Sequence, residues 1–342
     1  MVRAALTREP DVGSPGQRLV AVSGLGSIGT QHVHALGGSE DVAIVAFDPD
    51  QALREAARSA PGVRDTVADF EQLLAYEPDA LVIAGPDHVH LAQLRSAVTA
   101  GIPTMVEKPL AASWMEAADA RRWLMATAVP VLVGYVLRHR TVVREARLRL
   151  QQGAVGTPTS FQVLLGAYGT ITAAASRFAT PEHGRLYRDY SHEWDYLRWC
   201  FGPITRCLAV ARTVEEVAHV EQPNVVDGLL ECATGVVGSF HIDYVDPVGV
   251  RRLQVIGTNG SMIADIGRGI ITVRGPGSAA DEEQSFSEAP SVVLARQAAH
   301  LLAVADGEQL PVVGIEDGLA ALATSDALRR SAETRTWVDV PG

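Results

Sequence analysis

The amino-acid sequence predicts an α/β protein, with an N-terminal doubly wound parallel sheet followed by an α+β domain that has a mostly antiparallel open sheet. Two patterns lead to this prediction. Short apolar runs alternate with amphipathic helical stretches from Arg18 onward, whereas longer β-type runs dominate after Arg140. The length of 342 residues also exceeds what one simple core usually serves. We expect a flexible tail at residues 1–17, a first domain at 18–137 and a second at 138–342.

In the first domain, strands and helices alternate along the chain, which favours a parallel sheet covered by helices. Asp69 and Ser113 are predicted helix N-caps, and Pro49 is well placed at a helix start. The predicted strands are residues 19–22, 42–47, 80–84, 103–106 and 131–133. The predicted helices are residues 27–36, 49–58, 70–75, 89–100 and 113–126.

The second domain begins with a helix at residues 142–152 and continues in strands joined by short turns such as Thr258-Asn259-Gly260, which favour antiparallel hairpins. The predicted strands are residues 160–165, 204–211, 225–232, 236–242, 251–256, 261–264, 270–273 and 336–340. Further helices are predicted from about Ser191 and at residues 292–305 and 316–331. Edge strands of an open sheet need covering, so we expect a homo-oligomer, either a dimer or a tetramer.

Composition narrows the class of protein. The formal net charge is −11, which argues against a nucleic-acid partner. No apolar stretch approaches the roughly 18 residues needed to cross a bilayer, and the first residues lack the apolar core of a signal peptide. The cysteines, Cys200, Cys207 and Cys232, have no spacing typical of a metal or redox site. We expect a soluble cytoplasmic protein with reduced thiols and no metal.

A glycine-rich turn follows the first predicted strand and opens the first helix, in the order Gly24-Leu25-Gly26-Ser27-Ile28-Gly29. Gly24 permits the tight turn, Gly26 lets the backbone approach a diphosphate, and Gly29 lets the helix pack closely. The helix N-terminus adds free N–H groups and a positive dipole end. A string of this kind is weak evidence alone, but the strand before it and the helix after it are the context of a Rossmann dinucleotide site.

Asp48 lies 19 residues after Gly29, at the end of the second predicted strand. A carboxylate there can accept hydrogen bonds from the adenosine ribose hydroxyls, and it repels a 2′-phosphate, so NAD is preferred over NADP. The alternative is an Asp48-Pro49 turn that caps the next helix. Arg54 and Arg58 on that helix could still offer cationic contacts to a phosphate.

Three segments together resemble the glucose–fructose oxidoreductase / inositol dehydrogenase / MocA (Gfo/Idh/MocA) family. They are the glycine turn, the stretch from Gly85 to His90, and Glu107-Lys108-Pro109 directly after a predicted strand. The resemblance is specific over residues 18–135, moderate over 187–202 and architectural beyond. It implies that Lys108 is a catalytic residue beside a nicotinamide, and that the peptide before Pro109 is often cis.

The same resemblance places further residues along the cofactor: Pro86, Asp87, His90 and Glu107. For His90 a packing role on its helix is nearly as good an interpretation.

The second informative stretch runs from Asp189 to Leu197. Trp194, Leu197 and Phe201 have the spacing of a buried helical stripe. His192 stands at the N-terminal end of this helix, where the positive field favours a neutral imidazole that can accept a proton.

This stretch is similar to the family's Asp-plus-His signature, which implies catalytic roles for Asp189 and His192. Many members separate the two by four positions, whereas here they are three apart, so Asp195 is the reserve candidate. The family's glycine run before the signature is missing, and Val136 and Thr141 replace its usual Asn and Pro. Arg185 and Arg188 suit an anionic substrate, or are plain surface arginines.

The resemblance implies hydride transfer between a nicotinamide and a secondary alcohol of a sugar, inositol or related polyol. His192 would be the general acid/base with Asp189 holding its orientation, and Lys108 would stabilise charge on the oxygen or relay the proton. Which of Lys108 and His192 moves the proton stays open. Two alternatives are a non-catalytic NAD-binding sensor and an NAD-dependent eliminating glycosidase of the same fold.

Overall fold

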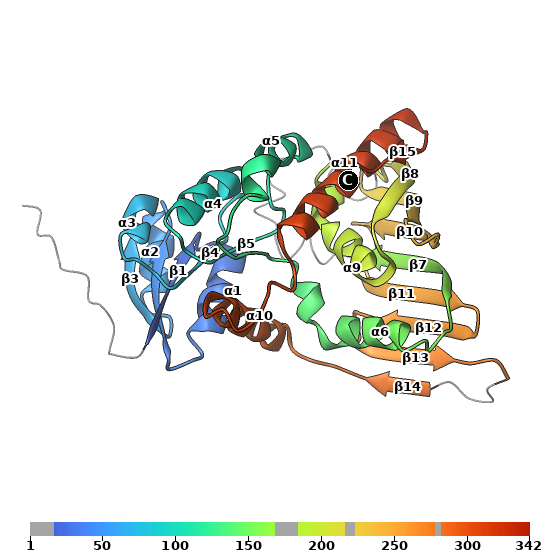
Figure 1. The fold of residues 1–342 in the computed structure, drawn as a ribbon, viewed down its shortest axis with the longest axis horizontal. Coiled ribbons are helices and arrows are strands. Elements are labelled where there is room, and N and C mark those ends of the chain that lie inside the picture. The colour runs from blue at the N-terminus through green and yellow to red at the C-terminus, as the bar shows by residue number, and fades with distance from the viewer. Residues whose placement is uncertain (1–16, 168–183, 216–222, 278–281) are drawn as a thin grey trace, which may run out of the picture. The chain divides into compact units, whose positions relative to one another are not determined.

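A computed structural model describes residues 17–167, 184–215, 223–277 and 282–342. The predicted tail at residues 1–17 lies outside the described residues except for Gln17. The chain forms two compact units (Figure 1). The described parts of the first unit are residues 17–107, 126–134 and 294–312, and the rest of the described chain forms the second unit. Each unit is treated by itself.

The first unit contains a six-stranded sheet in the order β3-β2-β1-β4-β5-β6, with every neighbouring pair parallel. The strands are β1 Arg18–Ser23, β2 Val42–Phe47, β3 Val63–Val67, β4 Ala80–Ile83, β5 Thr104–Val106 and β6 Val131–Val133. This order, in which the chain leaves β3 at one edge and resumes at β4 beside β1, is the doubly wound topology that the sequence predicted. Strand β3 was not predicted.

The helices of the first unit are α1 Ser27–Leu36, α2 Gln51–Ala57, α3 Phe70–Leu74, the short 3-10 helix η1 Asp87–Val89, α4 His90–Thr99 and most of α10 Pro290–Ala305. The Asp69 carboxylate accepts from the first N–H groups of α3, as predicted. The helix predicted from Pro49 begins at Gln51 instead, because the Asp50 side chain accepts from the Ala52 N–H and caps it there. From α10, Ala298, Leu301 and Val304 complete the core of this unit.

The second unit contains a nine-stranded sheet in the order β14-β13-β12-β11-β7-β10-β9-β8-β15. Its strands are β7 Pro158–Gly166, β8 Ile204–Arg212, β9 Val225–Cys232, β10 Val237–Asp243, β11 Val250–Gly257, β12 Gly260–Asp265, β13 Ile270–Arg274, β14 Glu282–Ser285 and β15 Val338–Asp339. The pair of β10 and β7 is parallel and the other pairs are antiparallel. This confirms the predicted α+β domain with a mostly antiparallel sheet.

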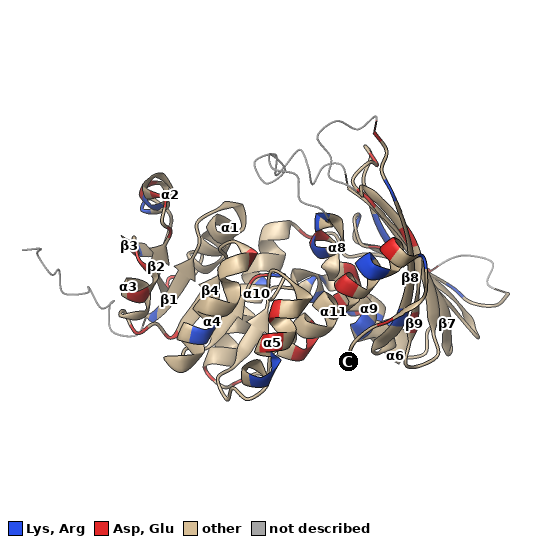
Figure 2. Ribbon diagram, turned by 90° about the horizontal axis from the view of Figure 1, so that it is seen from above, with Lys and Arg blue, Asp and Glu red and all other residues tan. Residues whose placement is uncertain are grey.

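The helices of the second unit are α5 Trp114–Leu124, the 3-10 helix η2 Val136–His139, α6 Thr141–Gln151, α8 Arg185–Asp189, α9 Ser191–Phe201 and α11 Ile315–Thr334. The Ser113 hydroxyl accepts from the Glu116 N–H and caps α5 as predicted. Helices α9 and α11 lie on one side of strands β7, β8 and β9 (Figure 2).

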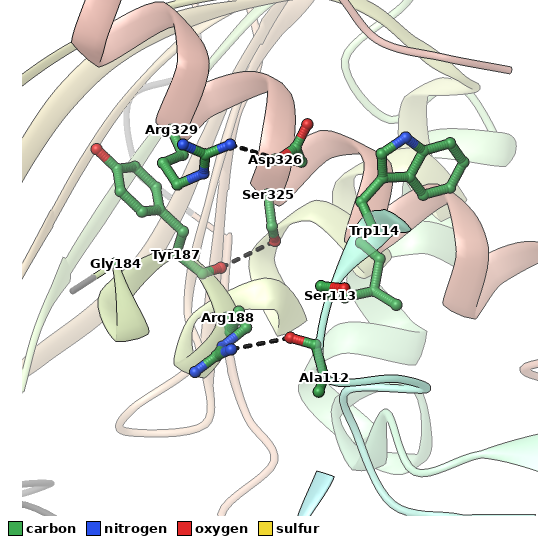
Figure 3. Close-up of a pocket in the computed structure, with 10 residues that line it drawn as sticks. Ala112, Ser113, Trp114, Gly184, Tyr187, Arg188, Ser325, Asp326 and Arg329 are labelled. Carbon is green, nitrogen blue, oxygen red and sulfur yellow. Dashed lines mark hydrogen bonds and ion pairs between the residues drawn. The ribbon is translucent and has the colours of Figure 1, made fainter. Parts of the chain in front are cut away.

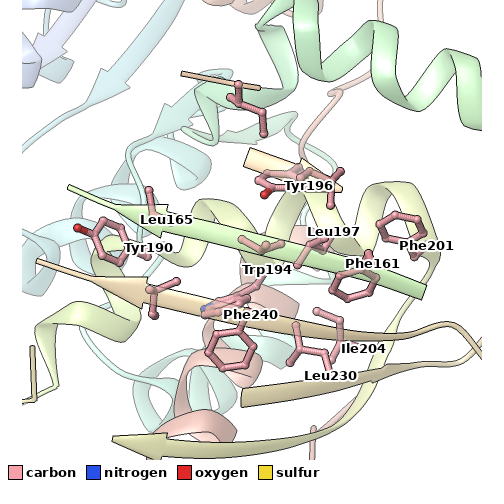
Figure 4. Close-up of a cluster of buried hydrophobic side chains, with 14 of the residues drawn as sticks. Phe161, Leu165, Tyr190, Trp194, Tyr196, Leu197, Phe201, Ile204, Leu230 and Phe240 are labelled. Atoms are coloured by element: carbon pink, nitrogen blue, oxygen red, sulfur yellow. The ribbon is translucent and has the colours of Figure 1, made fainter. Parts of the chain in front are cut away.

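The core of the second unit lies between α9 and the sheet (Figure 4). The predicted stripe of Trp194, Leu197 and Phe201 is buried there. Trp194 meets Phe240 of β10 edge to face at 5.1 Å between ring centroids, and Phe201 stacks on Phe161 of β7 at 4.9 Å. This packing fixes the start of α9, where the candidate catalytic residues stand.

Among the residues described, every helix is too short or too polar to span a bilayer.

Candidate active site

The glycine turn in the first unit has the backbone that each predicted role requires. Gly24 has φ +93°, and a Cβ on it would lie 2.5 Å from the Gly85 nitrogen. A Cβ on Gly29 would lie 1.8 Å from the Gly24 carbonyl oxygen, so the turn and the start of α1 can approach only as glycines. A Cβ on Gly26 would meet nothing within 4 Å. Gly26 is thus the position with open space above it.

The N-terminus of α1 is available to an anion. Gly26 is its N-cap residue and provides no side-chain cap, and Ser27 and Ile28 form the first helical turn. Backbone N–H groups at such an end attract phosphate oxygens. The turn therefore fits a diphosphate by its open space and by its donors.

Asp48 stands directly after β2, and its carboxylate reaches the glycine turn. Its Oδ2 accepts from the Leu25 N–H at 2.7 Å, and its Oδ1 accepts from the Asp50 N–H at 2.9 Å. Arg54 donates to the main-chain carbonyls of Asp48 and Pro49. The helix-capping alternative is not what the structure shows, because Asp50 caps α2. Each Asp48 oxygen keeps acceptor capacity for a further donor.

The segment after β4 lies against the glycine turn, as the close approach of Gly85 to Gly24 shows. Pro86 precedes η1, which begins at Asp87. His90 is buried at the start of α4, and its Nε2 is 2.9 Å from the Gly85 carbonyl oxygen. His90 therefore holds the backbone of this segment.

Glu107 is buried at the end of β5 and pairs with a residue that the sequence analysis did not single out. Its Oε1 lies 2.7 Å from Nε2 of His32, which is fully buried in α1. A Cβ on Gly134 would come within 2.8 Å of the Glu107 carboxylate, so that glycine makes room for it. Glu107 ties the end of β5 to the helix that follows the glycine turn.

In the second unit, Lys108 lies against Asp189, the last residue of α8. The Lys108 Nζ donates to the Asp189 carbonyl oxygen at 3.3 Å and lies 4.0 Å from Asp189 Oδ1. The Lys108-Pro109 peptide is cis. The side chain of Lys108 is 17% exposed and that of Asp189 is 7% exposed, so the pair is largely shielded from water.

Helix α8 is held to its surroundings from two further sides. Arg188 donates to the Ala112 carbonyl at 2.9 Å, and the Ser325 hydroxyl of α11 donates to the Tyr187 carbonyl at 2.9 Å (Figure 3). The same residues line a pocket with Trp114 and Arg329. Lys108 donates to residue 189, and Arg188 donates to residue 112. Two hydrogen bonds therefore connect the segment from residue 108 to residue 112 with α8.

His192 is partly buried in the first turn of α9, and Tyr135 packs edge to face on its ring at 5.4 Å between centroids. Burial lowers the pKa of His192 well below 6.5, and the charges of Lys108 and Arg251 lower it further. The neutral imidazole that the sequence predicted is therefore found, but burial is its main cause. Its buried Nδ1 has no hydrogen-bond partner among the described residues.

Asp195, the reserve candidate, belongs to a different cluster. It is 1% exposed, and its oxygens accept from Arg138 at 2.6 and 2.9 Å. Burial raises the pKa of Asp195 to about 7, and the Arg138 guanidinium opposes this rise. Arg138 also pairs with Asp317 at 2.9 Å in α11. The structure brings Asp189 to Lys108 and gives Asp195 an ion-pair partner elsewhere.

Two further residues around this cluster were missed from the sequence. Tyr244, directly after β10, donates to Asp189 Oδ2 at 2.8 Å. Arg251 of β11 pairs with the buried Glu193 at 2.8 Å and adds positive charge near His192. Neither lies in a motif. The available signals were weak: a tyrosine at a strand end, and an arginine in a strand that also carries Arg252 and Gln254.

Comparison with known proteins agrees with the fold. Residues 18–135 match the family described as an oxidoreductase family with an NAD-binding Rossmann fold, and residues 143–263 match the GFO/IDH/MocA C-terminal domain. Inositol 2-dehydrogenase 1 of Saccharopolyspora erythraea is 31% identical over 340 residues, covering 94% of this chain and 96% of that protein. The chain belongs to the GFO/IDH/MocA family. The predicted resemblance is thereby confirmed, and it extends into the second unit.

Other GFO/IDH/MocA proteins align over most of the chain. The 1,5-anhydro-D-fructose reductase of Ensifer adhaerens is 26% identical, covering 88% of this chain and 91% of its own. An oxidoreductase from Agrobacterium radiobacter, solved with NAD+, L-tartaric acid and magnesium, superposes with a TM-score of 0.85 at 20% identity, covering 95% and 98%. At that identity the superposition shows a shared fold. Within the described residues of this chain, no three His, Cys, Asp or Glu side chains gather as a metal site.

Proposed function

We propose that this GFO/IDH/MocA protein is a nicotinamide-dependent dehydrogenase that acts reversibly on a secondary alcohol of an inositol or sugar-type polyol. One observation carries the proposal: a shielded Lys108–Asp189 pair stands beside a histidine that is neutral at neutral pH. Oxidation of an alcohol needs a base for the hydroxyl proton and a positive charge for the oxygen. The relatives named as an inositol dehydrogenase and an anhydrofructose reductase support a polyol substrate.

We propose residues Gly24, Gly26, Ser27, Ile28, Gly29, Asp48, Pro86, Asp87, His90, Glu107 and Lys108 as the dinucleotide site. The open space at Gly26 and the uncapped start of α1 support the diphosphate position. In this site Glu107 acts by anchoring α1 through His32. When bound, the nicotinamide supplies the hydride acceptor or donor at its C4.

NAD is the proposed cofactor in preference to NADP. The Asp48 carboxylate supports this, because it is fixed by two backbone N–H groups at the end of β2, where a ribose would meet it. Arg54 lies close by, but it is bound to main-chain carbonyls. A 2′-phosphate would therefore meet a fixed negative charge.

We also propose separate roles for Lys108 and His192. A neutral imidazole has a lone pair for the hydroxyl proton, so we assign His192 as the base in the oxidative direction and the acid in the reductive direction. The Lys108 ammonium stabilises negative charge on the substrate oxygen. Asp189 holds Lys108 through its carbonyl and its carboxylate.

The experiment is a substrate screen with purified protein. Inositols, anhydro sugars, sugars and sugar phosphates are offered with NAD or NADP, and the NADH absorbance band is followed. We expect a net signal with NAD and a neutral polyol, and its loss by orders of magnitude in Lys108→Ala. Binding of NADH without turnover of any compound would favour the sensor, and product without net absorbance change would favour the eliminating glycosidase.

The surroundings of Arg185 and Arg188 favour a structural role over the binding of an anionic substrate. Arg185 is buried, and Arg188 uses its guanidinium to hold the Ala112 carbonyl. A KM for anionic substrates that is unchanged in Arg185→Ala and Arg188→Ala would rule out a binding role for them.

We further propose that the protein self-associates through the face of the nine-stranded sheet opposite α9 and α11. Exposed apolar side chains on that face support this: Val210, Leu229, Val237 and Ile256, each 37% to 56% exposed. Val237 and Ile256 both pair with Ser160 and so lie in one row. Burying such a row in a second copy removes apolar surface from water.

A cytoplasmic location is the remaining proposal. All three cysteines are free, and burial raises the pKa of Cys232 to about 11 and of Cys207 to about 12. Unreactive reduced thiols are typical of cytosolic proteins. Cell fractionation with an antibody against the chain tests this proposal.

A further inference from the structure

Tyr244 stands where β10 ends, and its hydroxyl reaches the last residue of α8. It is fully buried, yet its hydroxyl finds a partner, donating to Asp189 Oδ2 at 2.8 Å. The two residues are 55 positions apart in the sequence. A buried tyrosine hydroxyl bonded to a carboxylate is a strong, directional contact, because one partner carries charge.

The bond from Tyr244 fixes one oxygen of a carboxylate whose other oxygen faces Lys108. Asp189 Oδ1 lies 4.0 Å from the Lys108 Nζ, too far for a hydrogen bond, while Nζ bonds to the Asp189 main-chain carbonyl. Lys108 alone therefore does not set the rotation of this carboxylate. The Tyr244 hydroxyl restrains that rotation.

The end of β10 is itself held rigidly, which makes it a suitable anchor. Tyr190 donates to the Asp243 carbonyl at 2.9 Å, and its ring meets that of Tyr244 at 5.1 Å between centroids. The Asp243 carboxylate accepts from the N–H groups of Val245 and Asp246 at 2.6 Å each. These hydrogen bonds restrain the backbone of the turn that contains Tyr244.

We propose that Tyr244 is a positioning residue for the reaction, acting through Asp189 to set the direction in which the Lys108 ammonium points. This inference rests on the proposed function, since it gives Asp189 and Lys108 their place in catalysis. Tyr244 is assigned no contact with substrate or cofactor. Its effect belongs to turnover and not to cofactor affinity.

The test compares Tyr244→Phe with the matched control Tyr76→Phe, which removes a tyrosine hydroxyl that also donates to a carboxylate, that of Asp65 in the first unit, and leaves Asp189 its donor. We expect Tyr244→Phe to lower kcat roughly 10-fold, the loss of one hydrogen bond to a charged group, with the dissociation constant of NADH unchanged. Tyr76→Phe should keep a kcat close to that of the unchanged protein. Equal kcat values in the two variants would overturn the proposal.

A double-mutant cycle with Asp189→Ala shows whether Tyr244 acts through that residue. Once the acceptor is gone, Tyr244→Phe should lower kcat no further. A full additional loss would mean that Tyr244 acts by another route, and the proposal would be wrong.

A second double-mutant cycle measures stability, as the midpoint of urea unfolding, and does not require an active enzyme. The shifts of Tyr244→Phe and Asp189→Ala should be less than additive if the bond exists, and additive shifts would overturn it. Should the unchanged protein oxidise no compound of the screen, the proposed function fails, while this cycle still decides the bond between Tyr244 and Asp189.

Discussion

His192 shows how burial sets the chemistry of a single side chain. Desolvation lowers its pKa first, and the nearby Lys108 and Arg251 charges lower it further. The same lysine that would stabilise a substrate oxygen thus helps keep the imidazole unprotonated. Because the charged Lys108 disfavours a proton on His192, Lys108 is suited to stabilise charge and His192 to accept a proton.

The pH dependence of activity follows from this shift. Because the pKa of His192 lies well below 6.5, its base form persists as the solution is acidified through that value. We expect kcat/KM for alcohol oxidation to fall only well below pH 6.5 on the acid side. A profile measured in constant-ionic-strength buffers with an acid limb at or above 6.5 would contradict the assignment.

The lowered pKa of His192 also makes the stability of the protein depend on pH. Above pH 6.5 the histidine is neutral in both states and contributes nothing, whereas below it the unfolded chain gains the proton first. Stability should therefore fall as the pH drops below 6.5 toward the folded pKa. In His192→Gln this part of the slope, measured by urea unfolding at several pH values, should disappear.

Asp48 permits a test of cofactor choice at one residue. Asp48→Asn removes the charge but keeps an acceptor for the Leu25 N–H, so the glycine turn should survive. We expect the ratio of KM for NADP to KM for NAD to fall on the order of 10-fold, equal to about 1.4 kcal/mol. Asp50→Asn, which alters the cap of α2, is the control and should leave the ratio unchanged.

At the scale of elements, Arg138 joins η2, α9 and α11 in one ion-pair cluster with Asp195 and Asp317. It is 3% exposed, so its charge is almost fully removed from water. Such a pair is costly to break on one side, because the remaining charge stays buried.

Arg138→Leu should destabilise the protein by about 3–5 kcal/mol, because it leaves Asp195 buried without its cation. The double variant Arg138→Leu/Asp195→Leu should recover much of this loss. Urea unfolding of both variants measures the difference. A double variant as unstable as the single one would show that the pair does more than neutralise a buried carboxylate.

Elements with a clear apolar period or an N-cap were predictable from the sequence. Helix α1 and strand β9 fall at the predicted bounds, and Asp69 and Ser113 cap the helices expected of them. Among the described residues, two strands and one α-helix were missed for physical reasons, besides the short 3-10 helices η1 and η2. Strand β14 is four exposed polar residues, α8 has five residues, and β3 carries charged residues at its centre.

The candidate site was predictable only where a motif stands in one stretch of sequence. Lys108 and His192 belong to such stretches. The hydrogen bond from Tyr244 to Asp189 joins residues 55 positions apart, and the one between His32 and Glu107 joins residues 75 positions apart. The spacing of apolar residues along the sequence does not indicate such pairs. Long-range polar contacts depend on the register of the whole sheet.

At the scale of the whole molecule, self-association through the open sheet face is testable. The variant Val237→Lys/Ile256→Lys places two charges in one row of that face and should reduce the mass measured by light scattering. Leu310→Lys, at an apolar residue 87% exposed in the first unit, is the matched control and should leave the mass unchanged. An unchanged mass in the double variant would exclude this face as the interface.

Helix α10, late in the chain, completes the core of the first unit, and its Leu301 is fully buried in the same apolar cluster as residues of β1 and α1. A protein engineer who excised residues 18–137 as a ready-made NAD module would leave that apolar surface bare. The fragment would be expected to precipitate, and a chimera that exchanges cofactor preference with a relative would have to transplant residues 294–312 as well.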